Sequence, residues 1–219
     1  MDGRIVILYI HGMGGGEDSR IPSVLRRYLA ESETDAGPFF SLVVRTYSFD
    51  PEEAAVQIAS WTAEYSPDIV IGESLGALHA MRVKGMPHIL ISPSLGAAPH
   101  FRILSVLTLM PGVTALCDRV WKPKPGNRQR LHFTPSVLRK YAAHFRKAFE
   151  DAAGSGDSFF AFFGSRDHYR RSGVVRIGRY RKIFGDTYFI YDGTHFMEEE
   201  YLRTLLVPKI IALASEIRR

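Results

Sequence analysis

The chain carries six short runs of consecutive apolar, β-branched and aromatic residues, the pattern of strands that are buried on both faces of a parallel sheet. The first run, RIVILYI at Arg4–Ile10, is followed closely by glycines and shows the pattern most clearly. The other five runs are Ser41–Tyr47, Asp68–Gly72, His88–Ser92, Ser158–Gly164 and Thr187–Asp192. We therefore expect six strands.

Stretches with the apolar spacing of a helix lie between these runs. They are Ile21–Glu31, Pro51–Tyr65, Leu75–Lys84 and Glu198–Arg218. Asp50 is placed to cap the second of them, and Pro51 suits its first helical position. Because strands and helices alternate, we expect right-handed crossovers and an α/β fold with a doubly wound, mostly parallel sheet.

The interval 96–156 interrupts this alternation, because it is too long for a simple crossover. It contains two further expected helices, around Phe101–Met110 and Ser136–Ala152. We expect one domain over residues 1–219, with 96–156 inserted as a helical cap. The apolar stretch from Phe101 to Leu116 either roofs a pocket for an acyl chain or packs as ordinary core. Truncation of Leu107 or Leu109 would separate these readings.

The composition belongs to a globular protein. The chain has 219 residues, of which 46% are hydrophobic and 23% charged, and this excludes disordered and collagen-like classes. The single cysteine, Cys117, cannot form an internal disulfide, so a reducing compartment is expected. No apolar run is long enough for a membrane span, and the first is too short for an export signal. We expect a cytoplasmic protein.

The net charge is +5, from 28 Lys and Arg against 23 Asp and Glu. No zinc-finger, RNP or helix-turn-helix pattern accompanies the basic residues, so no nucleic-acid partner is expected. Most of these residues suit solvated faces, although a positive rim would also steer an anionic substrate. No cluster of His, Cys or carboxylates has metal-ligand spacing, so we expect no metal and no other cofactor.

The first chemical motif follows the third strand, where Gly72-Glu73-Ser74-Leu75-Gly76 leads directly into a helix. This is the G-x-S-x-G pattern at a strand-to-helix junction, which holds the central serine in a tight turn above the sheet. Ser74 is the candidate nucleophile. The helix that starts here would offer unpaired N–H groups to a developing oxyanion.

The second motif, HGMGGG at His11–Gly16, follows the first strand. Its glycines allow the backbone to approach a ligand, and we predict that Gly12, Gly14 and Glu73 contact substrate. The N–H groups of Met13 and Leu75 are the candidate oxyanion donors. Nucleotide binding is disfavoured, because the motif lacks a P-loop lysine and a third dinucleotide-type glycine. A flexible turn is the alternative.

A serine nucleophile needs a base, and the base needs a carboxylate to orient it. The fifth strand leads to Asp167 and the sixth to His195, and carboxyl ends of parallel strands meet at one edge of a sheet. We therefore expect Ser74, Asp167 and His195 to converge. The competing bases are His168, His79 and His100, and the competing carboxylate is Asp192. Asp167 would otherwise serve only as a cap for the segment that follows it.

In this order, HGMGGG, GESLG, GSRD and DGTHF resemble the oxyanion loop, nucleophile elbow, acid loop and histidine loop of the α/β-hydrolase superfamily. The resemblance covers Arg4–Leu95 and Ser158–Arg219. The sequence lacks two leading strands of the fuller pattern and has an atypical cap, so it is similar to a small member.

The resemblance implies a serine hydrolase that cleaves a carboxylic ester or thioester of a small-molecule acyl substrate through an acyl-enzyme on Ser74. An acyltransferase or a peptidase that uses the same residues is an alternative. So is a binding module that has the fold without turnover. The resemblance leaves the oligomeric state open.

Overall fold

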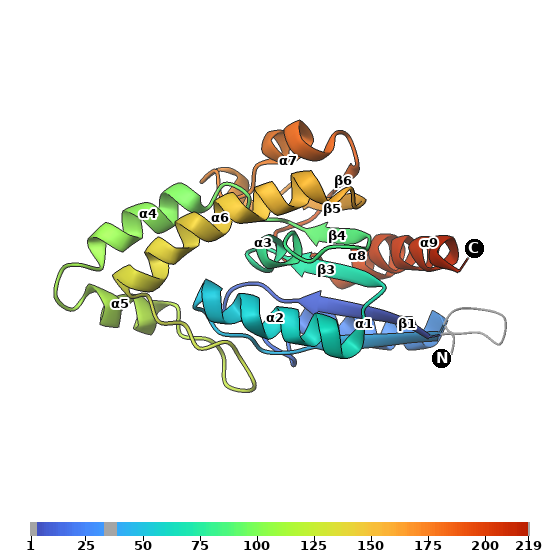
Figure 1. Cartoon of the computed structure of the whole chain (residues 1–219), viewed down its shortest axis with the longest axis horizontal. Coiled ribbons are helices and arrows are strands. Elements are labelled where there is room, and N and C mark those ends of the chain that lie inside the picture. The colour runs from blue at the N-terminus through green and yellow to red at the C-terminus, as the bar shows by residue number, and fades with distance from the viewer. Residues whose placement is uncertain (1–3, 33–38, 219) are drawn as a thin grey trace.

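The computed structural model describes residues 4–32 and 39–218. Its centre is a six-stranded sheet in the order β2-β1-β3-β4-β5-β6, in which every neighbouring pair is parallel (Figure 1). The strands are β1 (Arg4–Ile10), β2 (Phe39–Val44), β3 (Ile69–Glu73), β4 (His88–Ile91), β5 (Phe159–Gly164) and β6 (Tyr188–Tyr191). The predicted six-stranded parallel sheet is confirmed, with β2 beginning and ending earlier than expected.

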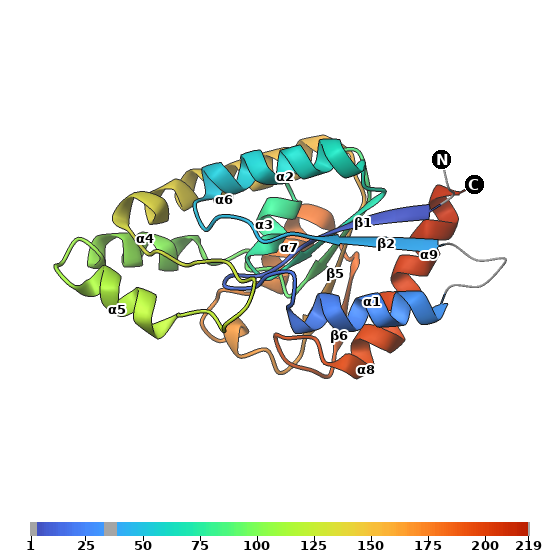
Figure 2. The same cartoon turned by 90° about the horizontal axis from the view of Figure 1, so that it is seen from below.

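Two layers of helices cover the sheet because alternate strand residues point to opposite faces. Leu8 and Ile10 pack on the face covered by α2 (Pro51–Tyr65), α3 (Gly76–Ala80), α6 (Pro135–Ser155) and α7 (Ile177–Phe184). Ile7 and Tyr9 pack on the other face, against α1 (Arg20–Ser32) and α9 (Val207–Ile217). Figure 2 shows α2 and α6 on one side of the strands and α1 on the other. The doubly wound arrangement is therefore also confirmed.

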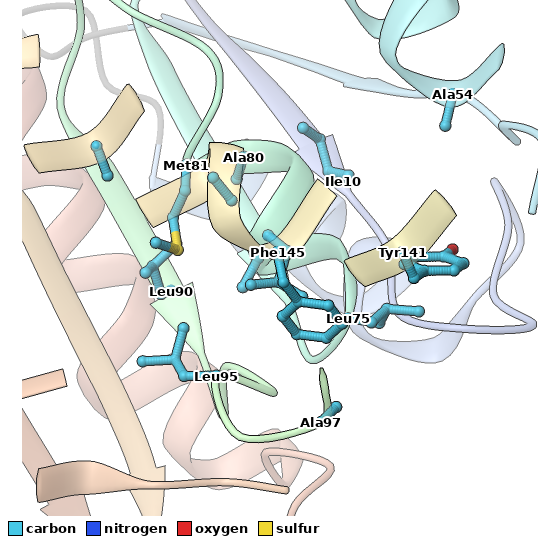
Figure 3. Close-up of a cluster of buried hydrophobic side chains, with 14 of the residues drawn as sticks. Ile10, Ala54, Leu75, Ala80, Met81, Leu90, Leu95, Ala97, Tyr141 and Phe145 are labelled. Carbon is cyan, nitrogen blue, oxygen red and sulfur yellow. The ribbon is translucent and has the colours of Figure 1, made fainter. Parts of the chain in front are cut away.

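The segment between β4 and β5 contains α4 (Ala98–Leu107), α5 (Val113–Val120) and α6. Helices α4 and α5 extend beyond the end of the sheet (Figure 1). The long α6 also belongs to the core, since Tyr141 and Phe145 pack in the same cluster as Leu75 (Figure 3). Sequence patterning missed α5 because its apolar side chains, among them Leu116 and Val120, are exposed and form no buried stripe.

Several helices differ from the patterns that predicted them. Helix α3 ends at Ala80, although its apolar spacing predicted a helix to Lys84. The terminal stretch is divided into α8 (Glu199–Tyr201), a π-helical turn η2 (Leu202–Leu206) and α9. Pro208 in the first turn of α9 lacks an N–H, which accounts for the change in the helical hydrogen-bond pattern in η2 just before it. Helix α7, which contains three basic residues, was also missed.

Within residues 4–32 and 39–218, no helix combines the length and the apolar character that crossing a membrane requires.

Candidate active site

Ser74 lies in a sharp turn between β3 and α3. Its φ of 52° is in the left-handed region, which costs a non-glycine residue about 1–3 kcal/mol. The turn is held by two backbone hydrogen bonds, from Ser74 N–H to Ile91 O at 2.9 Å and from Ser94 N–H to Ser74 O at 3.0 Å. The strained turn presents the Ser74 hydroxyl to the cavity at the carboxyl edge of the sheet.

The glycines that flank this serine are required by close packing. A Cβ at Gly72 would lie 2.6 Å from Ala77 Cα, and a Cβ at Gly76 would lie 2.2 Å from His11 O. The first glycine therefore allows α3 to pack on β3, and the second allows α3 to start beside the end of β1. Both contacts explain why the G-x-S-x-G pattern occurs at this junction.

His195 and Asp167 reach Ser74 from the ends of β6 and β5. His195 Nε2 lies 2.9 Å from Ser74 Oγ, and His195 Nδ1 lies 2.8 Å from Asp167 Oδ2. The exposed fraction is 2% for His195 and 3% for Asp167. The three residues that strand topology was expected to bring together are thus in one hydrogen-bonded chain.

Asp167 also caps the short η1 helix (His168–Arg170), the role that the sequence offered as its alternative. Asp167 Oδ1 accepts the Tyr169 N–H at 2.8 Å, while Oδ2 faces the imidazole. The capping bond fixes the direction of the carboxylate. The Tyr169 ring then packs against His195, with a centroid distance of 4.6 Å.

The competing residues lie elsewhere. Asp192 is exposed, pairs with Arg166 at 3.2 Å and accepts the Ser165 hydroxyl. His79 is buried between Tyr47 and His144, and burial lowers its pKa well below the ordinary value.

His168 stacks on Tyr169, and its ring centroid lies 6.4 Å from that of His195. His100 is exposed and lines the cavity from α4. Neither forms a hydrogen bond with Ser74, and His195 alone among the candidate bases contacts its hydroxyl.

The glycine-rich loop after β1 lies directly against Ser74. A Cβ at Gly12 would lie 3.2 Å from Ser74 Cβ. Gly14 N–H donates to Gln129 Oε1, and Gly15 N–H donates to Gly12 O, both at 3.0 Å. Across the described residues, the N–H groups of Met13 and Leu75 have no such acceptor. These are the two amides that the sequence singled out as oxyanion donors.

Gln129, which the sequence analysis did not single out, holds this loop in place. Its side chain accepts from Gly14 N–H and donates to Ser48 O, and its own N–H donates to Gly15 O at 2.7 Å. The residue is buried and belongs to the segment between α5 and α6. That segment therefore fixes the backbone beside the nucleophile.

Ser94 was also missed. Its hydroxyl lies 3.0 Å from Ser74 Oγ, and it follows β4 at the same edge of the sheet as the other site residues. The strand-end argument that selected Asp167 and His195 would have selected Ser94 as well. Glu73, by contrast, lines the cavity, but its carboxylate accepts the buried Tyr9 hydroxyl at 2.7 Å.

A cavity of about 930 Å³ opens above Ser74. Its lining includes the residues predicted to contact substrate, Gly12, Gly14 and Glu73, together with the proposed oxyanion residues Met13 and Leu75. From α4 it receives Phe101 and Leu104, whereas Leu107 and Leu109 are exposed and do not line it. One face of α4 thus borders the cavity, and the two leucines singled out by sequence, Leu107 at the end of α4 and Leu109 beyond it, lie outside the lining.

Over the part of the chain that the structure describes, His, Cys, Asp and Glu form no group of three that would hold a metal ion.

Comparison with known proteins gives a likeness in structure only. No protein-family profile matches the sequence, and no curated protein matches it. A monoacylglycerol lipase from Paleococcus ferrophilus superposes with a TM-score of 0.63 at 15% identity, over 98% of this chain and 96% of that chain. Est1E from Butyrivibrio proteoclasticus, solved with ferulic acid bound, gives a TM-score of 0.65 at 13% identity, over 96% and 90%. The chain has the α/β-hydrolase fold.

The α/β-hydrolase fold does not specify the reaction. A mutant of the haloalkane dehalogenase DatA from Agrobacterium tumefaciens is also similar, with a TM-score of 0.60 at 11% identity, over 98% of this chain and 91% of that chain. The activity of this α/β-hydrolase-fold chain has to be argued from its own residues.

Proposed function

We propose that the chain is a serine hydrolase that cleaves a carboxylic ester or thioester through an acyl-enzyme on Ser74. The observation that carries the proposal is the chain of hydrogen bonds from Ser74 Oγ through His195 to Asp167, at 2.9 Å and 2.8 Å, beside a cavity of about 930 Å³. A hydroxyl, an imidazole and a buried carboxylate in this order form the arrangement that activates a serine.

In the first half-reaction, Ser74 Oγ attacks the acyl carbonyl carbon and its proton passes to His195 Nε2. Asp167 accepts the Nδ1–H of His195, which holds the tautomer and stabilises the imidazolium. The N–H groups of Met13 and Leu75 bind the oxyanion. The bond from carbon to the leaving oxygen or sulfur then breaks, and His195 returns its proton to that atom.

In the second half-reaction, water replaces the leaving group. His195 takes a proton from this water, which attacks the acyl carbon. The bond to Ser74 Oγ then breaks, and His195 returns the proton to that oxygen. The products are a carboxylic acid and the regenerated serine. A serine at position 74 also disfavours dehalogenase and epoxide hydrolase chemistry, because those reactions use a carboxylate as the nucleophile at this point.

The test is labelling with a fluorophosphonate, which reacts with activated serines. We expect the wild type to be labelled at Ser74 and Ser74→Ala to be unlabelled, with a loss of turnover on the order of 10⁶ on any ester that the wild type cleaves. Ser105→Ala is the control, because Ser105 is a buried serine that lies outside the cavity lining. A panel of esters and thioesters of increasing chain length then identifies the substrate class.

Labelling at another residue would refute the role of Ser74. Binding of acyl compounds without labelling or hydrolysis would favour the alternative of a binding module without turnover.

A further inference from the structure

The cavity above Ser74 has a basic rim, which we define as Arg20, His100, Lys122, Lys124 and Arg128. These side chains come from three distant parts of the chain: the start of α1, α4, and the segment between α5 and α6. Their assembly therefore results from the fold and not from one basic stretch of sequence.

Little negative charge opposes this rim. Among the described residues, Glu73 is the only acidic one in the cavity lining. Asp18 pairs with Arg128 at 2.7 Å, but Arg20 donates to two neutral backbone carbonyls, those of Phe196 and Met197. The charge of Arg20 is thus not cancelled by its hydrogen bonds.

Lys122 and Lys124 are exposed, and neither forms an ion pair or hydrogen bond with any described residue. They flank Pro123, whose Cβ lies 3.8 Å from the position that a Cβ on Gly14 would take. The two free ammonium groups therefore belong to a segment that touches the loop beside Ser74. Cations in such a cleft raise the local concentration of anionic ligands and their association rate.

Much of the remaining cavity lining is apolar. It includes Phe101 and Leu104 from α4, Trp121 after α5, and Leu131 and Phe133 before α6. Such a wall suits an acyl chain, because burying its methylene groups is favourable. One cavity lined by both apolar and basic side chains suits a substrate that has an acyl chain at one end and an anionic group at the other.

We propose that the substrate is an acyl ester or thioester whose leaving alcohol or thiol carries a phosphate group. This inference rests on the proposed function and names the substrate class of the same site. The apolar wall holds the acyl chain, Ser74 faces the acyl carbonyl, and the basic rim binds the phosphate. An acylated glycerol phosphate and an acyl-coenzyme A share this chemistry.

The experiment compares pairs of substrates that share an acyl group and differ in whether the leaving group carries phosphate. One pair is a medium-chain 1-acylglycerol 3-phosphate and the corresponding 1-acylglycerol, and the other is an acyl-coenzyme A and the corresponding N-acetylcysteamine thioester. We expect kcat/KM to be higher for the phosphorylated member of at least one pair, on the order of tenfold at low salt. This preference should shrink as salt is added, since the charges are exposed.

The double variant Lys122→Gln/Lys124→Gln should reduce that preference to about twofold, mainly through KM. Arg26→Gln/Lys182→Gln is the matched control, because it removes two exposed positive charges outside the cavity lining. It should leave the preference unchanged. The pair that shows the preference distinguishes a glycerol phosphate from a coenzyme A ester.

Equal kcat/KM within both pairs would overturn the inference while leaving the proposed hydrolase in place. A preference that survives in Lys122→Gln/Lys124→Gln would overturn the assignment of phosphate recognition to these two lysines. Absence of cleavage for all four compounds, together with absence of fluorophosphonate labelling at Ser74, would overturn the proposed function and the inference with it.

Discussion

The hydroxyl of Ser94 lies 3.0 Å from the hydroxyl of Ser74, and the Ser94 N–H donates to Ser74 O at the same distance. In the proposed reaction Ser74 must donate its proton to His195, which leaves its oxygen lone pairs to accept from Ser94. Ser94 is therefore a positioning residue that restricts the rotamer of the nucleophile. It contacts Ser74 and not the proposed oxyanion donors.

Replacing Ser94 with alanine should reduce kcat about two- to tenfold, the value of one neutral hydrogen bond, while KM changes little. Steady-state ester hydrolysis measures both constants, and chemical denaturation measures the free energy of unfolding. Ser105→Ala is the control, since Ser94 and Ser105 are each 4% exposed and Ser105 donates only to its own helix. Equal losses of kcat in the two variants would contradict a positioning role.

Asp167→Asn distinguishes the two carboxylates near His195. The amide can still accept the Tyr169 N–H, but it no longer stabilises an imidazolium at 2.8 Å. We expect kcat to fall by about 10²–10⁴. In Asp192→Asn the exposed pair with Arg166 is lost, and kcat should stay within about twofold of the wild type. A larger loss in Asp192→Asn than in Asp167→Asn would reverse the assignment.

Gln129→Leu tests how the glycine-rich loop is held. The variant leaves the Gly14 N–H and Ser48 O without their side-chain partners, which should lower the free energy of unfolding by about 1–3 kcal/mol. If this loop supplies an oxyanion donor, kcat should fall more than KM rises. Gln129→Glu retains the acceptor for Gly14 and should recover part of kcat. A loss of stability with unchanged kcat would limit Gln129 to a structural role.

Four buried histidines make stability depend on pH. Burial lowers the pKa of His11 to about 4 and that of His144 to about 3, and it also lowers the pKa of His79 and of His88. In the unfolded chain each of these histidines binds a proton near the ordinary histidine pKa of about 6.5, whereas in the folded chain it stays neutral to a lower pH. The free energy of unfolding should therefore be insensitive to these groups above this value and fall as the pH decreases below it.

His79→Phe tests this linkage at one position. Neither ring nitrogen of His79 has a hydrogen-bond partner in the described residues, and its ring packs against Tyr47 and His144, so phenylalanine fits the site chemically. The free energy of unfolding should decrease less steeply with acid, by up to about 1.4 kcal/mol per pH unit. Urea denaturation between about pH 7.5 and pH 5 measures this slope. An unchanged slope would show that His79 is not protonated on unfolding.

The convergence of Ser74, Asp167 and His195 could be predicted because it depends on local patterns and one topological rule. Each residue follows a strand that its apolar run makes recognisable, and carboxyl ends of parallel strands share an edge. The contacts of Gln129 could not be predicted in this way. Gly14 and Gln129 are 115 positions apart in sequence, and their pairing depends on how the segment between α5 and α6 returns to the sheet.

The helices show a similar division. Helices with one buried face, such as α2, have a cap and apolar positions that the sequence displays, and Asp50 indeed accepts the Glu52 N–H at the start of α2. Helix α5 has exposed apolar residues, so the spacing of its apolar residues does not predict which side of the helix is buried. Helix α3 stops early because the chain turns after Ala80, a tertiary effect that apolar spacing does not encode.

Gly76 provides the sharpest test of how closely the nucleophile turn packs. A Cβ at this position would lie 2.2 Å from His11 O and 2.4 Å from Ile10 O, which are backbone atoms that cannot rotate away. Gly76→Ala must therefore displace α3 from the end of β1. We expect severe destabilisation and loss of activity, seen as a lower denaturation midpoint and as absent fluorophosphonate labelling.

Gly154 is the matched control, because it lies in α6 and a Cβ there would meet nothing within 4 Å. Gly154→Ala should leave labelling intact and stabilise the protein by up to about 1 kcal/mol, since alanine favours the helix. If Gly76→Ala folded with wild-type stability and labelled normally, the approach of α3 to the end of β1 would be looser than the structure shows. The strained backbone of Ser74 would then have to be held by contacts other than the packing of α3 against the end of β1.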